Sequence, residues 1–200
     1  MARGFGRLRR DDLLRAACGV IAARGFGHTR TADIARAAGV SQALLFYHFE
    51  TREKMLAQAL AYAAERDLAA LERMEASGGS PPERLRALLA LYSPGGRPTS
   101  WTLWIDARAE SVRDADLEAI CRETGLRWRR ALRSVVDEGV GTGAFDCADP
   151  DGAVWRIIAL VDGLAAQVTA HRRLLTRARL AELVRASAEL ELGLPRGALC

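Results

Sequence analysis

The sequence predicts an all-α protein with a three-helix N-terminal domain and a body of about six helices. Apolar residues recur at intervals of three and four positions along most of the 200-residue chain, and no segment shows the alternation typical of a strand. Half of the residues are hydrophobic, which is enough for a substantial core in a chain of this length. Glycines, prolines and capping residues divide the chain into segments of helical length.

The first helix is expected from Asp11 to Arg24. Its two acidic residues lie at the positive end of the helix dipole. Gly25 ends the helix, and Phe26 is expected to fill the small core of the N-terminal domain. Four residues form the apolar stripe at i, i+3, i+4 and i+7: Leu14, Ala17, Cys18 and Ile21.

Residues 29–54 have the pattern of two short helices joined by a tight turn and followed at once by a third helix. Gly39 is suited to the left-handed end of the first short helix. Ser41 is a good N-cap for the second, which is expected from Gln42 to Phe49. This order is typical of a helix-turn-helix, whose second helix enters the DNA major groove.

The same spacing also fits an αα-hairpin inside a helical bundle, so the side chains must separate the two interpretations. Gln42 can pair bidentately with adenine, and Ala43 and Leu44 offer apolar contacts to a thymine methyl group. Tyr47 and His48 are polar aromatic residues suited to phosphate contact. These residue types favour the DNA-binding interpretation.

Positive charge is concentrated in the same part of the chain. Residues 1–60 carry a net charge of +5, whereas the remaining residues carry −1. Arg52 and Lys54 begin the third helix beside the expected DNA surface. Such a distribution matches a phosphate partner. The segment Met1–Arg10 is rich in glycine and arginine and is expected to be either a basic arm on DNA or a solvated tail.

The residues from Gly25 to Glu53 resemble the DNA-binding domain of the TetR family of bacterial repressors. The resemblance covers about the first 60 residues and is carried by Gly25-Phe26, Thr29-Arg30-Thr31, Ile34-Ala35, Ala38-Gly39-Val40-Ser41, Phe46-Tyr47-His48-Phe49 and Arg52-Glu53. Two positions depart from the family pattern. Phe46 stands where a tyrosine is usual, which removes a hydroxyl, and Arg52 stands where a lysine is common, which keeps the charge.

The resemblance implies that residues 29–31 and Arg52 contact phosphates, while Gln42, Ala43, Tyr47 and His48 face the groove. The predicted DNA-binding residues are Thr29, Arg30, Thr31, Ser41, Gln42, Ala43, Leu44, Tyr47, His48, Arg52 and Lys54.

The body is expected to be helical throughout, with loops at Ser77–Pro82 and Ser93–Pro98. Its end, residues 193–200, is expected to be frayed. The glycine-rich stretch Gly139–Phe145 lacks the Lys-Ser/Thr of a nucleotide loop and is interpreted as a helix end and turn. The expected helices run from Thr51 to Ala76, Glu83 to Tyr92, about Ser100 to Val112, Asp116 to Asp137, Pro150 to His171 and Thr176 to Glu191.

A dimer is expected because a lone recognition helix reads only a few base pairs. The last two helices are the best candidates for the interface, and in the TetR family a four-helix bundle between protomers is usual. The alternative is that their apolar faces pack inside one monomer. The predicted interface residues are Ile158, Val161, Gly163, Ala165, Leu183, Val184 and Leu190.

The body also holds all four tryptophans, which either fill the core or line an apolar pocket for a small molecule. TetR-family bodies generally bind such inducers, and residues 101–170 resemble the BetI-like subgroup. The identity of the ligand does not follow from that resemblance. The predicted pocket residues are Tyr92, Trp101, Trp104, Ile105, Arg108, Trp128, Trp155 and Gln167.

Several classes of protein are disfavoured. No apolar run approaches the ~20 residues of a membrane span, and no signal peptide is present, so a cytoplasmic protein without a membrane partner is expected. The four cysteines are scattered and are expected to be reduced thiols. The three histidines have no partner at ligand or triad spacing. We therefore expect no metal, no cofactor, no catalytic residue and no enzymatic activity.

The predicted organisation is a helix-turn-helix DNA-binding domain at residues 1–50 and a regulatory and dimerisation domain at residues 51–200. The predicted function is that of a homodimeric transcriptional repressor. It would bind a palindromic double-stranded DNA operator and be released by an unidentified small-molecule ligand. The alternative is a helical protein-interaction module that has lost specific DNA binding.

Overall fold

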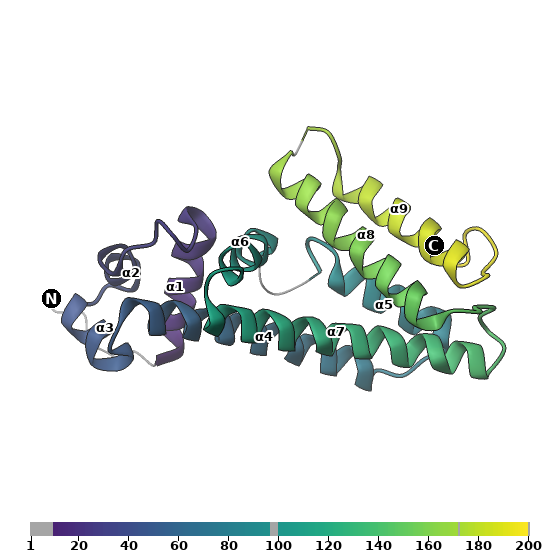
Figure 1. Ribbon diagram of the computed structural model, residues 1–200, viewed down its shortest axis with the longest axis horizontal. Coiled ribbons are helices and arrows are strands. Elements are labelled where there is room, and N and C mark those ends of the chain that lie inside the picture. The colour runs from purple at the N-terminus through teal and green to yellow at the C-terminus, as the bar shows by residue number, and fades with distance from the viewer. Residues whose placement is uncertain (1–9, 97–99, 172, 200) are drawn as a thin grey trace, which may run out of the picture. The chain divides into compact units, whose positions relative to one another are not determined.

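The computed structural model describes residues 10–96, 100–171 and 173–199, and these residues form nine α-helices and no strand (Figure 1). The predicted all-α fold class is confirmed. The predicted basic arm lies outside the described residues except for Arg10. The helices are α1 (Arg10–Arg24), α2 (Thr31–Ala38), α3 (Gln42–Phe49), α4 (Arg52–Ala76), α5 (Pro81–Tyr92), α6 (Trp101–Ser111), α7 (Ala115–Gly141), α8 (Pro150–Ala170) and α9 (Arg177–Glu191).

The chain forms two compact units. Unit 1 comprises residues up to 66 together with residues 102–122, and unit 2 comprises residues 67–101 and those from 123 onward. Helices α4 and α7 each contribute to both units. The predicted domain boundary at residue 50 falls inside unit 1, because the first part of α4 and most of α6 pack with the N-terminal helices.

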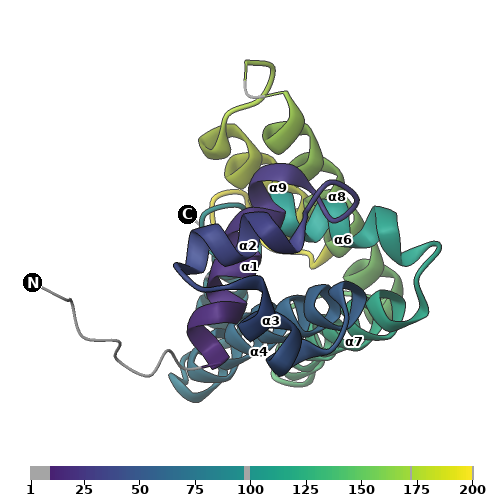
Figure 2. The ribbon, with the colours of Figure 1, turned by 90° about the vertical axis from the view of Figure 1, so that its left-hand side faces the viewer.

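Unit 1 is built around one apolar core. Helix α1 packs against α2, and α2 packs against α3 (Figure 2). Phe26, in the loop between α1 and α2, is 3% exposed, as expected for a residue that fills this core. The core also takes in Trp104 from α6. Its largest members include Leu13, Ile21, Ile34, Leu45, Phe49, Met55, Leu60 and Trp104.

Unit 2 is a helical bundle in which α8 runs beside α9 and α5 packs against α9 (Figure 1). Helix α5 begins with a capping box, in which Glu83 accepts hydrogen bonds from the amide and hydroxyl groups of Ser80. The hydroxyl and the amide together lower the pKa of Glu83. The carboxylate of Glu75 on α4 pairs with Arg127 on α7 at 3.4 Å.

One helix of the described residues, α8, is long and apolar enough to cross a membrane by length and composition. The expectation that no segment reaches this threshold was therefore wrong. Core helices of soluble proteins pass the same test. Here the inner face of α8, with Val154, Ile157, Val161 and Ala165, is buried against the rest of unit 2.

The glycine-rich stretch at residues 139–145 ends a helix, as the sequence indicates. Helix α7 continues four residues beyond its predicted end at Asp137 and includes Gly139 and Gly141. Phe145 folds back over Gly139 and is 4% exposed. The absence of a side chain at Gly139 lets this ring lie directly against the helix backbone.

Contrary to expectation, residues 193–199 do not fray; Cys200 lies outside the described residues. Glu189 on α9 is 4% exposed, and its carboxylate accepts hydrogen bonds from the amides of Gly197 at 3.0 Å and Leu199 at 2.9 Å. Leu199 is fully buried. A buried carboxylate bonded to two amides is well satisfied, so it fixes the terminal turn on α9.

Substitution of Gly139 by alanine should destabilise unit 2. A Cβ atom there would lie 2.1 Å from Cδ2 of Phe145, so the ring must move and the free energy of unfolding should fall by about 1–3 kcal/mol. Urea denaturation followed by circular dichroism measures the change. Gly125→Ala, in the middle of the same helix, is the matched control: its Cβ meets nothing within 4 Å, and a gain of about 0.5–1 kcal/mol is expected. Equal stability of the two variants would contradict this account of Phe145.

Candidate DNA-binding surface and regulatory cavity

The turn between α2 and α3 has the geometry of a helix-turn-helix. Gly39 ends α2 in the left-handed conformation with φ 69°, and the amide of Val40 donates to the carbonyl of Ala35 at 3.0 Å. The hydroxyl of Ser41 accepts a hydrogen bond from the amide of Leu44 at 3.2 Å and so caps α3. The sequence therefore identified both residues that fix the turn.

Helix α3 buries one narrow face and exposes the others. Leu45 and Phe49, one turn apart, are 1% and 2% exposed in the core of unit 1. Gln42 and Ala43 are exposed, and Tyr47 is 82% exposed. A large aromatic side chain so open to solvent, on a helix held firmly by its opposite face, is suited to contact a partner.

The side chain of Gln42 is held in place by α2. The hydroxyl of Thr31 donates a hydrogen bond to Oε1 of Gln42 at 3.0 Å. An amide oxygen has a second lone pair, and Nε2 keeps both of its hydrogens, so the outer edge of the amide can still pair with a base. The contact orients the side chain that the sequence predicts to recognise a base.

Two predicted phosphate-contacting residues are engaged inside unit 1. Thr29 is 1% exposed, and its hydroxyl donates to the carbonyl of Gly25 at 2.6 Å. The guanidinium of Arg52 donates from Nε to the carbonyl of Thr29 at 2.8 Å and from a terminal nitrogen to the carbonyl of Phe26 at 2.6 Å. A phosphate contact by either side chain stays a prediction.

The other polar residues of this surface lie nearer to solvent. Arg30 is exposed at the N-cap position of α2, and His48 is half-buried with its ring 5.4 Å from that of Tyr47. Lys54 pairs with Glu50, and this hydrogen bond and charge lower the pKa of the Glu50 carboxyl. The carboxylate of Glu50 partly neutralises the charge of Lys54. The exposed guanidinium of Arg30 is therefore the better candidate for a phosphate contact.

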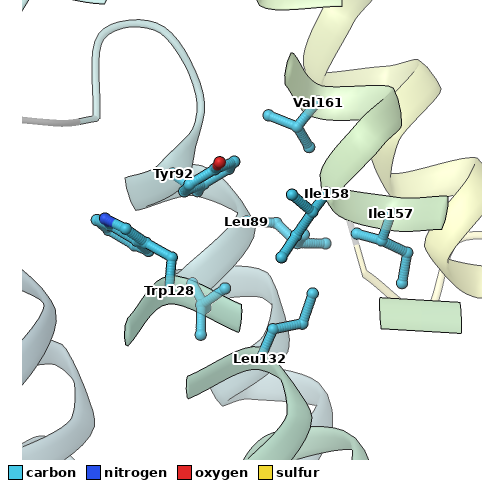
Figure 3. A pocket seen from close by; sticks show the side chains of 8 residues that line it. Leu89, Tyr92, Trp128, Leu132, Ile157, Ile158 and Val161 are labelled. Carbon is cyan, nitrogen blue, oxygen red and sulfur yellow. The ribbon is translucent and has the colours of Figure 1, made fainter. Parts of the chain in front are cut away.

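A small apolar cavity lies in unit 2 between α5, α7 and α8 (Figure 3). Its volume is about 10 Å³, close to the minimum of ~10–15 Å³ that a single water molecule needs and far below the ~300–1,000 Å³ of most ligand pockets. It is lined by Leu88, Leu89, Tyr92, Trp128, Leu132, Ile157, Ile158 and Val161.

The aromatic rings on one side of the cavity form a cluster. The ring of Tyr92 lies 5.0 Å from that of Trp128 and 5.8 Å from that of Trp101, measured between centroids. The hydroxyl of Tyr92 donates to a carboxylate oxygen of Asp162 at 2.8 Å. The cavity thus has an aromatic wall, an aliphatic wall and one polar group at its edge.

The structure brings together only part of the predicted pocket. Tyr92 and Trp128 line the cavity, and Trp101 packs against Tyr92. Trp155 is 52% exposed beneath the guanidinium of Arg129, and Gln167 is also exposed. The remaining predicted members, Trp104, Ile105 and Arg108, belong to unit 1.

The aliphatic lining was missed as a pocket signal. In the sequence Leu88, Leu89, Leu132 and Ile157 are ordinary members of apolar helical stripes, and a stripe does not reveal whether it faces a core or a cavity. The predicted interface residues Ile158 and Val161 also line this cavity.

The other predicted interface residues differ in their exposure. Ala165 and Val184 are buried within a single chain, like Val161. Gly163 is exposed, Leu183 is half-buried, and Leu190 is 85% exposed. The last three are therefore the members of the predicted interface that a second chain can contact.

Two family models match the chain. Residues 81–193 match the C-terminal domain of BetI-type transcriptional repressors, and residues 13–59 match the bacterial regulatory proteins of the tetR family. The first of these matches covers more than half of the chain. No curated protein sequence matches the chain significantly.

Solved structures of transcriptional regulators share the fold. A regulator from Saccharomonospora viridis in complex with choline is 27% identical, with a TM-score of 0.82 over 92% of this chain and 96% of that one. A TetR-family regulator from Rhodococcus sp. is 28% identical, with a TM-score of 0.74 over 92% and 97%. FadR from Bacillus subtilis in complex with stearoyl-CoA, 21% identical with a TM-score of 0.71 over 92% and 98%, shows the fold alone.

The matches agree with the helix-turn-helix geometry of α2 and α3 and with a helical body. The two models, over residues 13–59 and 81–193, belong to one family, whose members are DNA-binding regulators and not enzymes. The chain belongs to the TetR family of bacterial transcriptional regulators, with a C-terminal domain of the BetI type.

Proposed function

We propose that this protein is a cytoplasmic homodimeric repressor that binds a palindromic operator and is released when a small molecule binds unit 2. The observation that carries the proposal is the exposed face of α3, where Gln42 is oriented by Thr31 and Tyr47 stands open to solvent. Both side chains are of types that read or position DNA. The N-terminal concentration of positive charge supplies the electrostatic attraction.

A dimer supplies the second recognition helix. The outer face of α8 carries a row of small residues, Ala159, Gly163, Ala166 and Ala170, and a Cβ at Gly163 would meet nothing within 4 Å. On α9 the predicted interface residue Leu190 is 85% exposed and so is accessible to a second chain. Small residues allow two helices to approach closely, and a two-fold axis would bring two copies of α3 to half-sites ~34–36 Å apart.

The cavity in unit 2 is the proposed inducer site. In the present conformation it has room for no more than about one water molecule, so a ligand can bind only in a conformation in which the cavity is larger. Such a ligand lowers DNA affinity only if it binds the two conformations unequally, with a coupling free energy of typically ~1–3 kcal/mol. Because a related regulator was solved with choline, choline is the first compound to test.

Retention of the DNA upstream of its own gene tests the proposal. The labelled duplex should be shifted by the protein in the presence of random competitor DNA, and the retention should weaken steeply as salt is raised. Choline and other small molecules can then be screened for release in the same assay. A protein that retains no DNA at low salt would instead be the interaction module that the sequence left open.

Gln42→Ala should relax the preference for one base pair in each half-site by about 1–3 kcal/mol. The measurement is selection of binding sequences from a random library for the wild type and the variant. Ala37, exposed on α2 outside the groove-facing set, provides the control variant Ala37→Gln, which should leave the selected sequence unchanged. An identical sequence profile for Gln42→Ala would refute the base-reading role.

Leu190→Glu should shift the protein from dimer to monomer, because it places a charge on an exposed apolar position of the proposed interface. Light scattering coupled to size-exclusion chromatography gives the mass directly. Val112→Glu makes the same change at a position that is 80% exposed in unit 1, and this variant should stay dimeric. If both variants keep the dimer mass, the interface lies elsewhere.

A further inference from the structure

The loop between α1 and α2 is held by two oppositely charged side chains that reach it from distant parts of the chain. At Phe26 the amide donates to the carboxylate of Asp106, while the carbonyl accepts from the guanidinium of Arg52 at 2.6 Å. Both partners lie within unit 1. One residue of the loop therefore has each of its backbone polar groups bound to a charged side chain.

Asp106 comes from α6, 80 positions further along the chain. Its carboxylate lies directly over the loop, because a Cβ built on Gly25 would be 3.1 Å from Oδ2 of Asp106. Gly25 has φ 83°, which also favours glycine at this position. Glu110, one turn further along α6, approaches Gly27 in the same way, with 3.6 Å between its Oε1 and a Cβ built on that residue.

Arg52 holds the loop from the first turn of α4. Besides Phe26 it donates to the carbonyl of Thr29 at 2.8 Å and approaches that of Gly27 at 3.4 Å. Its other terminal nitrogen lies 3.4 Å from Glu53. The planar fork of an arginine can bind several carbonyls at once, whereas the single nitrogen of a lysine cannot reproduce this arrangement.

The held loop leads directly to the DNA-reading residues. The hydroxyl of Thr29 closes the loop on Gly25, Arg30 is the N-cap of α2, and Thr31 orients Gln42. A displacement of the loop would therefore move the start of α2 and the side chain that contacts Gln42. The contacts form a continuous chain from α6 and α4 to the recognition helix.

We propose that Asp106 and Arg52 are positioning residues for DNA recognition, and that Arg52 acts through the loop carbonyls rather than as a phosphate contact. This inference rests on the proposed DNA binding. It assigns to α6 a direct part in shaping the recognition surface, through a hydrogen bond to one backbone amide.

Variants of Arg52 separate the positioning role from a phosphate contact. A phosphate contact would survive in Arg52→Lys, and its loss in Arg52→Ala would reduce the salt slope by about one. The positioning role predicts that both variants lower operator affinity roughly 5- to 30-fold while the slope stays at the wild-type value. Arg113→Ala, an exposed arginine of unit 1, is the matched control for loss of charge and should retain wild-type affinity.

Variants of Asp106 test the other side of the loop. Asp106→Asn keeps a carbonyl oxygen that accepts the Phe26 amide and should retain most of the affinity, whereas Asp106→Ala should lose roughly as much as Arg52→Ala. Hydrogen exchange provides a readout that needs no DNA: the Phe26 amide should be protected in the wild type and in Asp106→Asn, and exposed in Asp106→Ala. Asp116→Ala, exposed in unit 1, is the control.

The outcomes distinguish this inference from the proposed function. If the wild type fails to bind DNA, the proposed function is wrong, and unchanged Phe26 protection in Asp106→Ala would overturn the loop contact independently. If the wild type binds DNA but Arg52→Lys binds equally well, or Arg52→Ala loses one unit of salt slope, Arg52 is a phosphate contact and the inference fails. Loss of affinity in both Arg52 variants at constant slope, with rescue in Asp106→Asn, supports it.

Discussion

The burial of Leu45 and Phe49 is the constraint on which the proposed DNA-binding surface depends. An eight-residue helix is too short to be stable alone in water, so α3 exists only because these two side chains lie in the core of unit 1. The burial also fixes the rotation of α3 about its axis. Gln42 and Tyr47 are exposed because Leu45 and Phe49 are not. The packing of one side of α3 therefore determines which residues form the proposed DNA-binding surface on the opposite side.

The polar groups of unit 1 are arranged to hold backbone in place as much as to meet DNA. Thr29 and Arg52 donate hydrogen bonds to loop carbonyls, and Asp106 accepts one from a loop amide. Ser41 caps α3. Buried or half-buried polar groups require such partners, and each satisfied group also defines a position. Recognition of bases needs side chains placed within about 0.5 Å. The hydrogen-bonded loop before α2 and the turn between Gly39 and Ser41 after it hold both ends of this helix.

Unit 2 uses apolar surface in three different ways. The inner face of α8 fills the core, part of the same face borders the cavity beside Tyr92 and Trp128, and the outer face carries the small residues proposed to meet a second chain. A helix with apolar residues on so many sides also passes a simple test for a membrane span. The neighbouring helices α5, α7 and α9 cover the inner face of α8.

The sequence by itself determined the helices, the turn at Gly39, the cap at Ser41 and the family, because these depend on local backbone preferences and on residues close together in the chain. It also predicted that α3 would carry the exposed Gln42 and Tyr47. Only the tertiary structure decided that Arg52 reaches loop carbonyls, that Asp106 meets Phe26, and that Ile158 and Val161 border a cavity. It likewise showed that Glu189 fixes the C-terminal turn. The physical reason is that a helical stripe specifies which residues are buried, whereas the partner that buries them comes from elsewhere in the chain.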